Sequence, residues 1–70
     1  MQGLVTRFFK KHGRKPYGFI EGYDGESYFF NGKMLVDVIQ EGDEVTFKGK
    51  SNERGNYACD IQKIEGNNNG

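Results

Sequence analysis

The fifteen residues Tyr17-Gly-Phe-Ile-Glu-Gly-Tyr-Asp-Gly-Glu-Ser-Tyr-Phe-Phe-Asn31 contain two short apolar runs that are separated by a turn sequence. The runs at 17–21 and 27–31 are rich in aromatic residues and have the length of strands. The Asp24-Gly25 step between them is a strong hairpin signal, because both residue types tolerate the positive φ angles of a tight turn. The stretch therefore predicts two antiparallel strands joined by a short turn.

Alternation along a strand assigns each of these aromatic side chains to a face, because successive residues point to opposite sides of the sheet. Tyr17 and Phe19 share one face of the first run, and Ile20 lies on the other. In the second run, Phe29 points away from its two aromatic neighbours. A core that takes Ile20 and those neighbours leaves Tyr17, Phe19 and Phe29 together on the outside. An exposed aromatic cluster of this kind predicts a binding surface.

Three further segments alternate between apolar and polar residues and are predicted as strands, at 3–9, 44–48 and 57–64. Residues 34–39 form a short apolar run that fits a helical turn or an extended linker, so they are predicted to be irregular. Five strands with a gap between the third and the fourth match an all-β, five-stranded antiparallel Greek-key barrel of the OB type. The residues predicted to face inward are Val5, Phe8, Ile20, Tyr28, Phe30, Val45, Phe47, Cys59 and Ile61.

The length and composition fit one small domain. The chain has 70 residues, of which 34% are apolar, and it has eleven glycines and one proline. This length excludes a multidomain enzyme, and the glycine content favours tightly turning strands. Residues 1–65 are predicted to form the single OB-type domain, and residues 66–70 (Gly-Asn-Asn-Asn-Gly) a disordered tail with nothing to bury.

The residues that support catalysis or metal binding are scarce. One cysteine and one histidine, Cys59 and His12, cannot make an intrachain disulfide or a zinc site of the usual kind. They lie on different predicted segments, and we expect neither catalysis nor a cofactor or metal. No stretch approaches the roughly 18–20 apolar residues of a membrane span, and the first residues do not resemble a signal peptide. We therefore expect a cytoplasmic protein.

The charge is zero overall but unevenly distributed along the chain. Residues 1–20 carry five cations and no acid, whereas residues 21–47 carry seven acids and one cation. The cations of the first segment are Arg7, Lys10, Lys11, Arg14 and Lys15. Exposed aromatic rings beside cations are what single-stranded nucleic acid requires, because unpaired bases stack on rings and cations contact the phosphates.

Five segments in order resemble the cold-shock domain family, from Gly3 to about Ile64. They are Gly3-Leu-Val-Thr-Arg-Phe8, Lys15-Pro-Tyr-Gly-Phe-Ile20, Ser27-Tyr-Phe-Phe-Asn31, Glu41-Gly-Asp-Glu-Val-Thr-Phe47 and Arg54-Gly-Asn-Tyr-Ala-Cys-Asp-Ile61. The second and third are similar to the two RNA-binding motifs of that family. The resemblance implies an OB barrel that binds single-stranded RNA or DNA with low sequence selectivity, often as an RNA chaperone. It places Tyr17, Phe19 and Phe29 on base-stacking positions and Lys15 on the basic position beside them.

The chain also departs from the family pattern at positions that matter for binding. Arg7 stands where the family usually has a tryptophan, Asn31 where it has a stacking histidine, and Gly32 at another aromatic position. Pro16 replaces a glycine and removes a backbone N–H. The segment 9–15 is longer than usual, and the segment 32–40 is shorter. The missing rings predict an affinity below the family norm, and the basic loop offers compensation.

The sequence thus predicts a non-enzymatic, monomeric protein that binds single-stranded RNA or DNA, with no membrane and no small-molecule substrate as partner. The candidate nucleic-acid-binding residues are Arg7, Lys10, Lys11, His12, Arg14, Lys15, Tyr17, Phe19, Phe29 and Asn31. Two alternatives stay open. Residues 32–34 and 39–46 faintly resemble bacterial translation initiation factor one, another small OB protein, which implies a ribosomal partner. The barrel could instead use its aromatic cluster to bind another protein.

Overall fold

The structure is a computed structural model that describes residues 1–10 and 13–64. Two of the candidate site residues, Lys11 and His12, and the tail predicted at 66–70 lie outside the described residues. The elements are, in chain order, the strands and one 3₁₀ turn β1 (Gln2–Phe9), β2 (Tyr17–Gly22), β3 (Ser27–Asn31), η1 (Gly32–Met34), β4 (Glu44–Asn52) and β5 (Gly55–Lys63).

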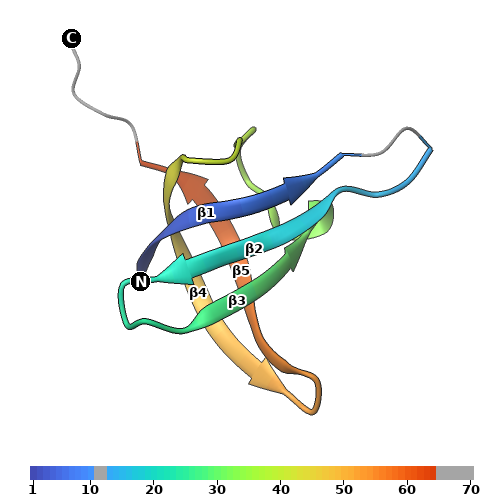
Figure 1. Cartoon of the computed structure of the whole chain (residues 1–70). Helices are drawn as coiled ribbons and strands as arrows, with labels where there is room; N and C mark the ends of the chain where they lie inside the picture. The colour runs from blue at the N-terminus through green and yellow to red at the C-terminus, as the bar shows by residue number, and fades with distance from the viewer. Residues whose placement is uncertain (11–12, 65–70) are drawn as a thin grey trace, which may run out of the picture.

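The five strands form a closed barrel in the order β1-β2-β3-β5-β4, and β4 pairs back with β1 (Figure 1). The prediction of an all-β, five-stranded barrel is confirmed. Not every pair is antiparallel, however, because β3 and β5 run parallel where Phe29 lies beside Tyr57. A closed ring with an odd number of strands cannot alternate direction throughout, so one neighbouring pair must be parallel.

Among the described residues, nine buried side chains form the core, and they are Val5, Ile20, Tyr28, Phe30, Ile39, Val45, Phe47, Ala58 and Ile61. Seven of them were predicted to face inward. Phe8 is half-buried and packs against this core, with its ring centroid 5.5 Å from that of Phe30. Ile39 was not predicted to be buried. It lies in the connection that follows η1, where the Val36 N–H donates to the Ile61 carbonyl over 2.9 Å and holds the connection against β5.

A β-bulge in β1 decides which of its side chains face outward. Val5 pairs with Ile20 but Arg7 pairs with Phe19, so Thr6 is an extra residue in β1. A regular strand would place Val5 and Phe8 on opposite faces, and the extra residue brings both toward the core. The same shift turns Arg7 outward beside Phe19.

The inward orientation predicted for Cys59 is wrong. Cys59 is half-buried, and its neighbour Ala58 is fully buried instead. The cause is a second irregularity, between the pairs Thr46–Gln62 and Lys48–Cys59, where β5 contains one residue more than β4. Within it Asp60 adopts a left-handed conformation with φ of 51°, which Asp tolerates better than most residues. The extra residue inverts the alternation, so that Ala58 and Ile61 both point inward.

Strands β4 and β5 are longer than predicted, because they continue through residues 49–52 and 55–56 to a tight turn. The resulting hairpin extends beyond the barrel on the side of β3 (Figure 1). The hairpin lies next to the outer surface of β2 and β3 and lines one side of it. Within residues 1–10 and 13–64, the structure contains no helix with the length and apolarity that a membrane crossing requires.

Candidate functional site

Four aromatic rings lie in a row on the outer surface of β1, β2 and β3. The centroid of Phe9 is 5.0 Å from that of Tyr17, Tyr17 is 6.3 Å from Phe29, and Phe29 is 5.8 Å from Phe19. Tyr17 and Phe29 are exposed, with 40% and 37% of their surface accessible. Phe19 and Phe9 are half-buried. The outward orientation predicted for Tyr17, Phe19 and Phe29 is confirmed. We call the four residues the aromatic face.

Gly18, between two rings of the aromatic face, allows β1 and β2 to approach closely. A Cβ at Gly18 would collide with the carbonyl oxygen of Arg7 and would lie 2.8 Å from the ring of Phe30. Alternation places Tyr17 and Phe19 on one side of β2, and glycine between them lets β1 approach closely while the ring of Phe30 fills the space beneath it. The β1 bulge adds Phe9, which pairs with Tyr17 across the strands.

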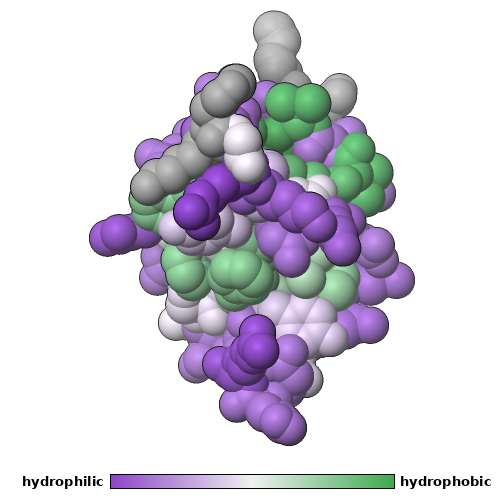
Figure 2. Space-filling model, turned by 90° about the vertical axis from the view of Figure 1, so that its right-hand side faces the viewer, coloured by the Kyte–Doolittle hydropathy of each residue, from purple (hydrophilic) through white to green (hydrophobic). Residues whose placement is uncertain are grey.

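A pocket of about 440 Å³ continues the aromatic face toward the β4–β5 hairpin. Its lining residues are Phe19, Phe29, Met34, Asn52, Arg54, Gly55, Asn56 and Tyr57. Most of them come from η1 and the hairpin, and sequence analysis did not include them among the candidate residues. Tyr57 reaches the site because it lies beside Phe29 in the parallel pair of β3 and β5. Figure 2 shows a hydrophobic area on this side of the molecule with hydrophilic surface above and below it.

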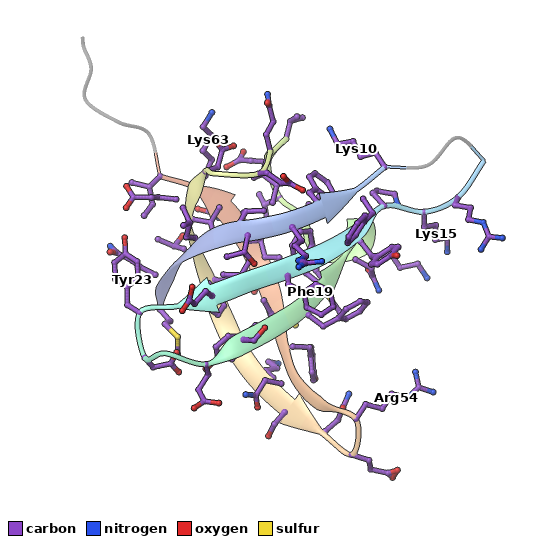
Figure 3. All side chains as sticks on the ribbon, viewed as in Figure 1. Lys10, Lys15, Phe19, Tyr23, Arg54 and Lys63 are labelled. Carbon is purple, nitrogen blue, oxygen red and sulfur yellow. The ribbon has the colours of Figure 1, made fainter. Side chains whose placement is uncertain are left out.

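Cations lie at both ends of the aromatic face. Figure 3 shows Phe19 on the side of the barrel that has Lys15 at one end and Arg54 at the hairpin tip. Arg7 is exposed and is the register partner of Phe19. Lys10 is oriented differently, because its Nζ lies over the ring of Phe8, 4.9 Å from the centroid. The structure thus places Arg7 beside Phe19, leaves Lys15 exposed in the connection just before Tyr17, and directs Lys10 to Phe8.

These cations form no ion pair with any acid among residues 1–10 and 13–64. The ion pairs there are Lys48–Asp60, with an N–O distance of 3.4 Å, and Lys63–Asp43 at 3.8 Å. Arg7, Arg14, Lys15 and Arg54 are all exposed. Within the described part of the chain, the charges around the rings are therefore available to an anionic ligand.

Asn31 lies at the end of the aromatic face as the register partner of Tyr17 and is half-buried. Its Oδ1 accepts a hydrogen bond of 2.9 Å from the backbone N–H of Lys33 and caps η1. This candidate residue therefore has a structural partner already, and it presents no ring to a base.

Carboxylates gather at the opposite end of the barrel, around the β2–β3 turn and the start of β4. Tyr28 donates a 2.6 Å hydrogen bond to Asp24, and Tyr23 donates one of 2.6 Å to Glu44. The bond to Asp24 raises the pKa of the Tyr28 phenol to about 12 and lowers the pKa of Asp24. The bond to Glu44 raises the pKa of Tyr23. Figure 3 shows Tyr23 at the far end from Lys15, so the barrel has an acidic end and a basic end.

No known protein family matches the chain, and a comparison with curated proteins finds no match. Within the described residues, no three histidine, cysteine, aspartate or glutamate side chains gather as metal ligands would.

Proposed function

We propose that this protein binds single-stranded RNA or DNA on the aromatic face, with low sequence selectivity and without catalysing a reaction. The observation that carries the proposal is the unbroken row of rings Phe9, Tyr17, Phe29 and Phe19 on one outer surface. Every nucleobase has a flat face that can stack on such a ring, and each stacked base is worth about 1–3 kcal/mol. Only unpaired bases can reach the rings, since bases in a duplex stack on one another.

The cations provide the second half of the proposed mechanism. Phosphates of a strand that crosses the face would meet Arg7 and Lys15 on one side and Arg54 on the other. A base held on a ring is unavailable for pairing, so binding would keep RNA from re-forming structure. The protein would thereby act as an RNA chaperone, and we propose that it does so as a monomer in the cytoplasm.

The strand order supports assignment of the barrel to the OB type, in which β3 and β5 are neighbours although β4 lies between them in sequence. The resemblance to cold-shock domains is consistent with the geometry, because its two RNA-binding motifs fall on β2 and β3 and supply three of the four rings. We therefore propose a cold-shock-like OB protein whose ring row includes Phe9 and lacks the usual tryptophan and histidine.

The decisive experiment is a titration of the whole protein with fluorescently labelled oligothymidine and with a duplex of the same length, followed by anisotropy. We expect the single strand to bind more tightly. Phe29→Ala should weaken binding by about 1–3 kcal/mol, whereas Tyr23→Ala, which removes an aromatic side chain that is 61% exposed at the acidic end, should leave it unchanged. Equal binding of strand and duplex, or equal loss in both variants, would rule the aromatic face out as the site.

Exposed apolar residues elsewhere favour protein binding as a second candidate function. Val36 and Val38, in the connection before β4, have 58% and 82% of their surface accessible. A partner protein could bind there or on the rings. The initiation-factor alternative has the same fold with folded ribosomal RNA as its partner. Titration with folded ribosomal RNA tests that alternative, and a protein-binding barrel would bind neither RNA nor oligothymidine.

A further inference from the structure

Asn31 and Gly32 form an Asn-Gly step at the end of the aromatic face. In such a step the Gly amide nitrogen, once its proton is lost to base, can attack the Asn side-chain carbon Cγ. The bond from Cγ to Nδ2 then breaks, ammonia leaves, and a cyclic succinimide remains. Water opens the ring to aspartate or isoaspartate. Glycine makes the attack easy, because it has no Cβ to hinder the approach and leaves the backbone free to rotate.

Three features of the structure oppose this reaction. Ring closure requires the Cα–Cβ bond of Asn31 to eclipse the peptide C–N bond, and the extended ψ of 176° holds the two bonds staggered. The Gly32 N–H donates a 2.9 Å hydrogen bond to the Pro16 carbonyl. The Oδ1 of Asn31 accepts a 2.9 Å hydrogen bond from the Lys33 N–H, which fixes the side chain. The nucleophile and the electrophile are thus both held in place.

We propose that Asn31-Gly32 is a latent deamidation site, which the closed barrel protects and which reacts when the junction of β3, η1 and Pro16 opens. Pro16 leads directly into β2, and Gly32 follows β3, so the hydrogen bond between them closes the end of the β2–β3 pair. Loss of this bond frees the Gly32 nitrogen and the rotation about ψ together. The rate of deamidation at Asn31 therefore depends on how often this end of the aromatic face opens.

The product has a consequence that rests on the proposed function. Conversion of Asn31 to aspartate adds a negative charge beside Tyr17, its register partner. Aspartate caps a helical turn as well as asparagine does, so its carboxylate can keep the bond to the Lys33 N–H and leave the fold intact. The new charge repels phosphates within reach of the rings, and conversion to aspartate would lower affinity for a single strand without unfolding the barrel.

The protection of Asn31 from deamidation is tested by incubating the full chain in mildly alkaline buffer, with and without urea at a concentration that unfolds it. Peptide mass spectrometry then follows conversion of Asn31. We expect the folded protein to convert at least about tenfold more slowly than the unfolded chain, because reaction requires the open state. Gly32→Ala in urea is the control and should convert slowly. Equal rates with and without urea, or no conversion in urea, would overturn the proposal.

Binding is tested by comparing Asn31→Asp with the neutral variant Asn31→Ser, whose hydroxyl can also cap η1. We expect Asn31→Asp to bind labelled oligothymidine several-fold more weakly than Asn31→Ser at low salt, with the difference shrinking at high salt. Equal binding by both variants would disprove the link between deamidation and binding. If the unchanged protein binds no oligonucleotide, the proposed function fails, while the protection of Asn31 is still decided by mass spectrometry.

Discussion

Phe19 and Phe29 are register partners on β2 and β3, and their rings meet edge to face with centroids 5.8 Å apart at an interplanar angle of 68°. Contacts of this geometry contribute about 0.5–1.5 kcal/mol beyond burial. The pair orients both rings while Phe29 keeps 37% of its surface accessible. Binding then costs less, because the side chains that receive the ligand are already ordered.

Arg7→Trp is expected to tighten binding of a single strand. Arg7 is exposed on β1 opposite Phe19, so a ring there would extend the aromatic face by one position. One additional stacked base is worth about 1–3 kcal/mol. Anisotropy with labelled oligothymidine should be measured at high salt, where loss of the Arg7 charge has little effect. Arg7→Leu is the control for that lost charge, and an Arg7→Trp variant that binds no better than Arg7→Leu would contradict the prediction.

The double variant Arg14→Gln/Lys15→Gln should reduce the salt dependence of binding. Each phosphate contact on a single strand contributes a slope of about −0.7 to log affinity against log salt concentration, so two lost contacts flatten it by up to about 1.4. Preferences among bases should change little, because phosphate contacts carry no sequence information. Lys48→Gln/Lys63→Gln removes the same charge from residues that are ion-paired to Asp60 and Asp43. A similar slope change in both double variants would argue against phosphate contacts beside the rings.

Alternation alone predicts three of the four rings of the aromatic face because β2 and β3 pair without a bulge. Tyr17, Phe19 and Phe29 pair in unbroken register with Asn31, Phe29 and Phe19 respectively. In β5, by contrast, alternation fails at Cys59, because the extra residue beside the left-handed Asp60 turns Ala58 inward. Where a strand bulges depends on the strand that lies opposite, and a single sequence does not contain that information.

The residues of the β4–β5 hairpin that lie beside the aromatic face were not predictable for a related reason. Tyr57 and Arg54 reach the aromatic face through the parallel pairing of β3 with β5, which joins segments far apart in the sequence. That pairing follows from closure of the barrel and produces no pattern in the local amino-acid sequence. Ile39 is buried for the same reason, because the connection before β4 is held against the barrel by the bond between Val36 and Ile61.

Gly18→Ala should destabilise the barrel and weaken binding together. The added Cβ collides with the Arg7 carbonyl and presses on the Phe30 ring, and overpacking of this kind costs about 1–3 kcal/mol. Gly13→Ala is the comparison, because a Cβ there meets no atom of the described residues within 4 Å and carries only the strain of the positive φ of 81°. Urea denaturation measures both variants. If Gly18→Ala lost no more stability than Gly13→Ala, the close approach of β1 to β2 would not be essential.

The hydrogen bond from Tyr28 to Asp24 should stabilise the protein over a pH range bounded at both ends. The pKa of Asp24 is lowered from 3.8 in the folded state, chiefly by this bond. The stabilisation of the fold by ionised Asp24 is therefore present above about pH 4 and is lost as the pH falls through the folded pKa. The pKa of Tyr28 is raised from 10.0 to about 12 by the same bond. The stabilisation of the fold by the protonated Tyr28 hydroxyl is therefore complete below pH 10.0 and is lost as the pH rises through the pKa of Tyr28 in the folded state.

Tyr28→Phe removes the hydroxyl and keeps the ring, which packs on Phe47 with centroids 5.0 Å apart. We expect this variant to be less stable than the unchanged protein at neutral pH. The difference should shrink in acid and in alkali, because the unchanged protein loses the bond there and the variant lacks it at every pH. The measurement is the free energy of unfolding in urea as a function of pH. Tyr17→Phe removes a hydroxyl for which the described residues provide no carboxylate partner, and it should leave the profile unchanged. A constant difference between Tyr28→Phe and the unchanged protein across the whole pH range would show that the bond to Asp24 does not account for the loss.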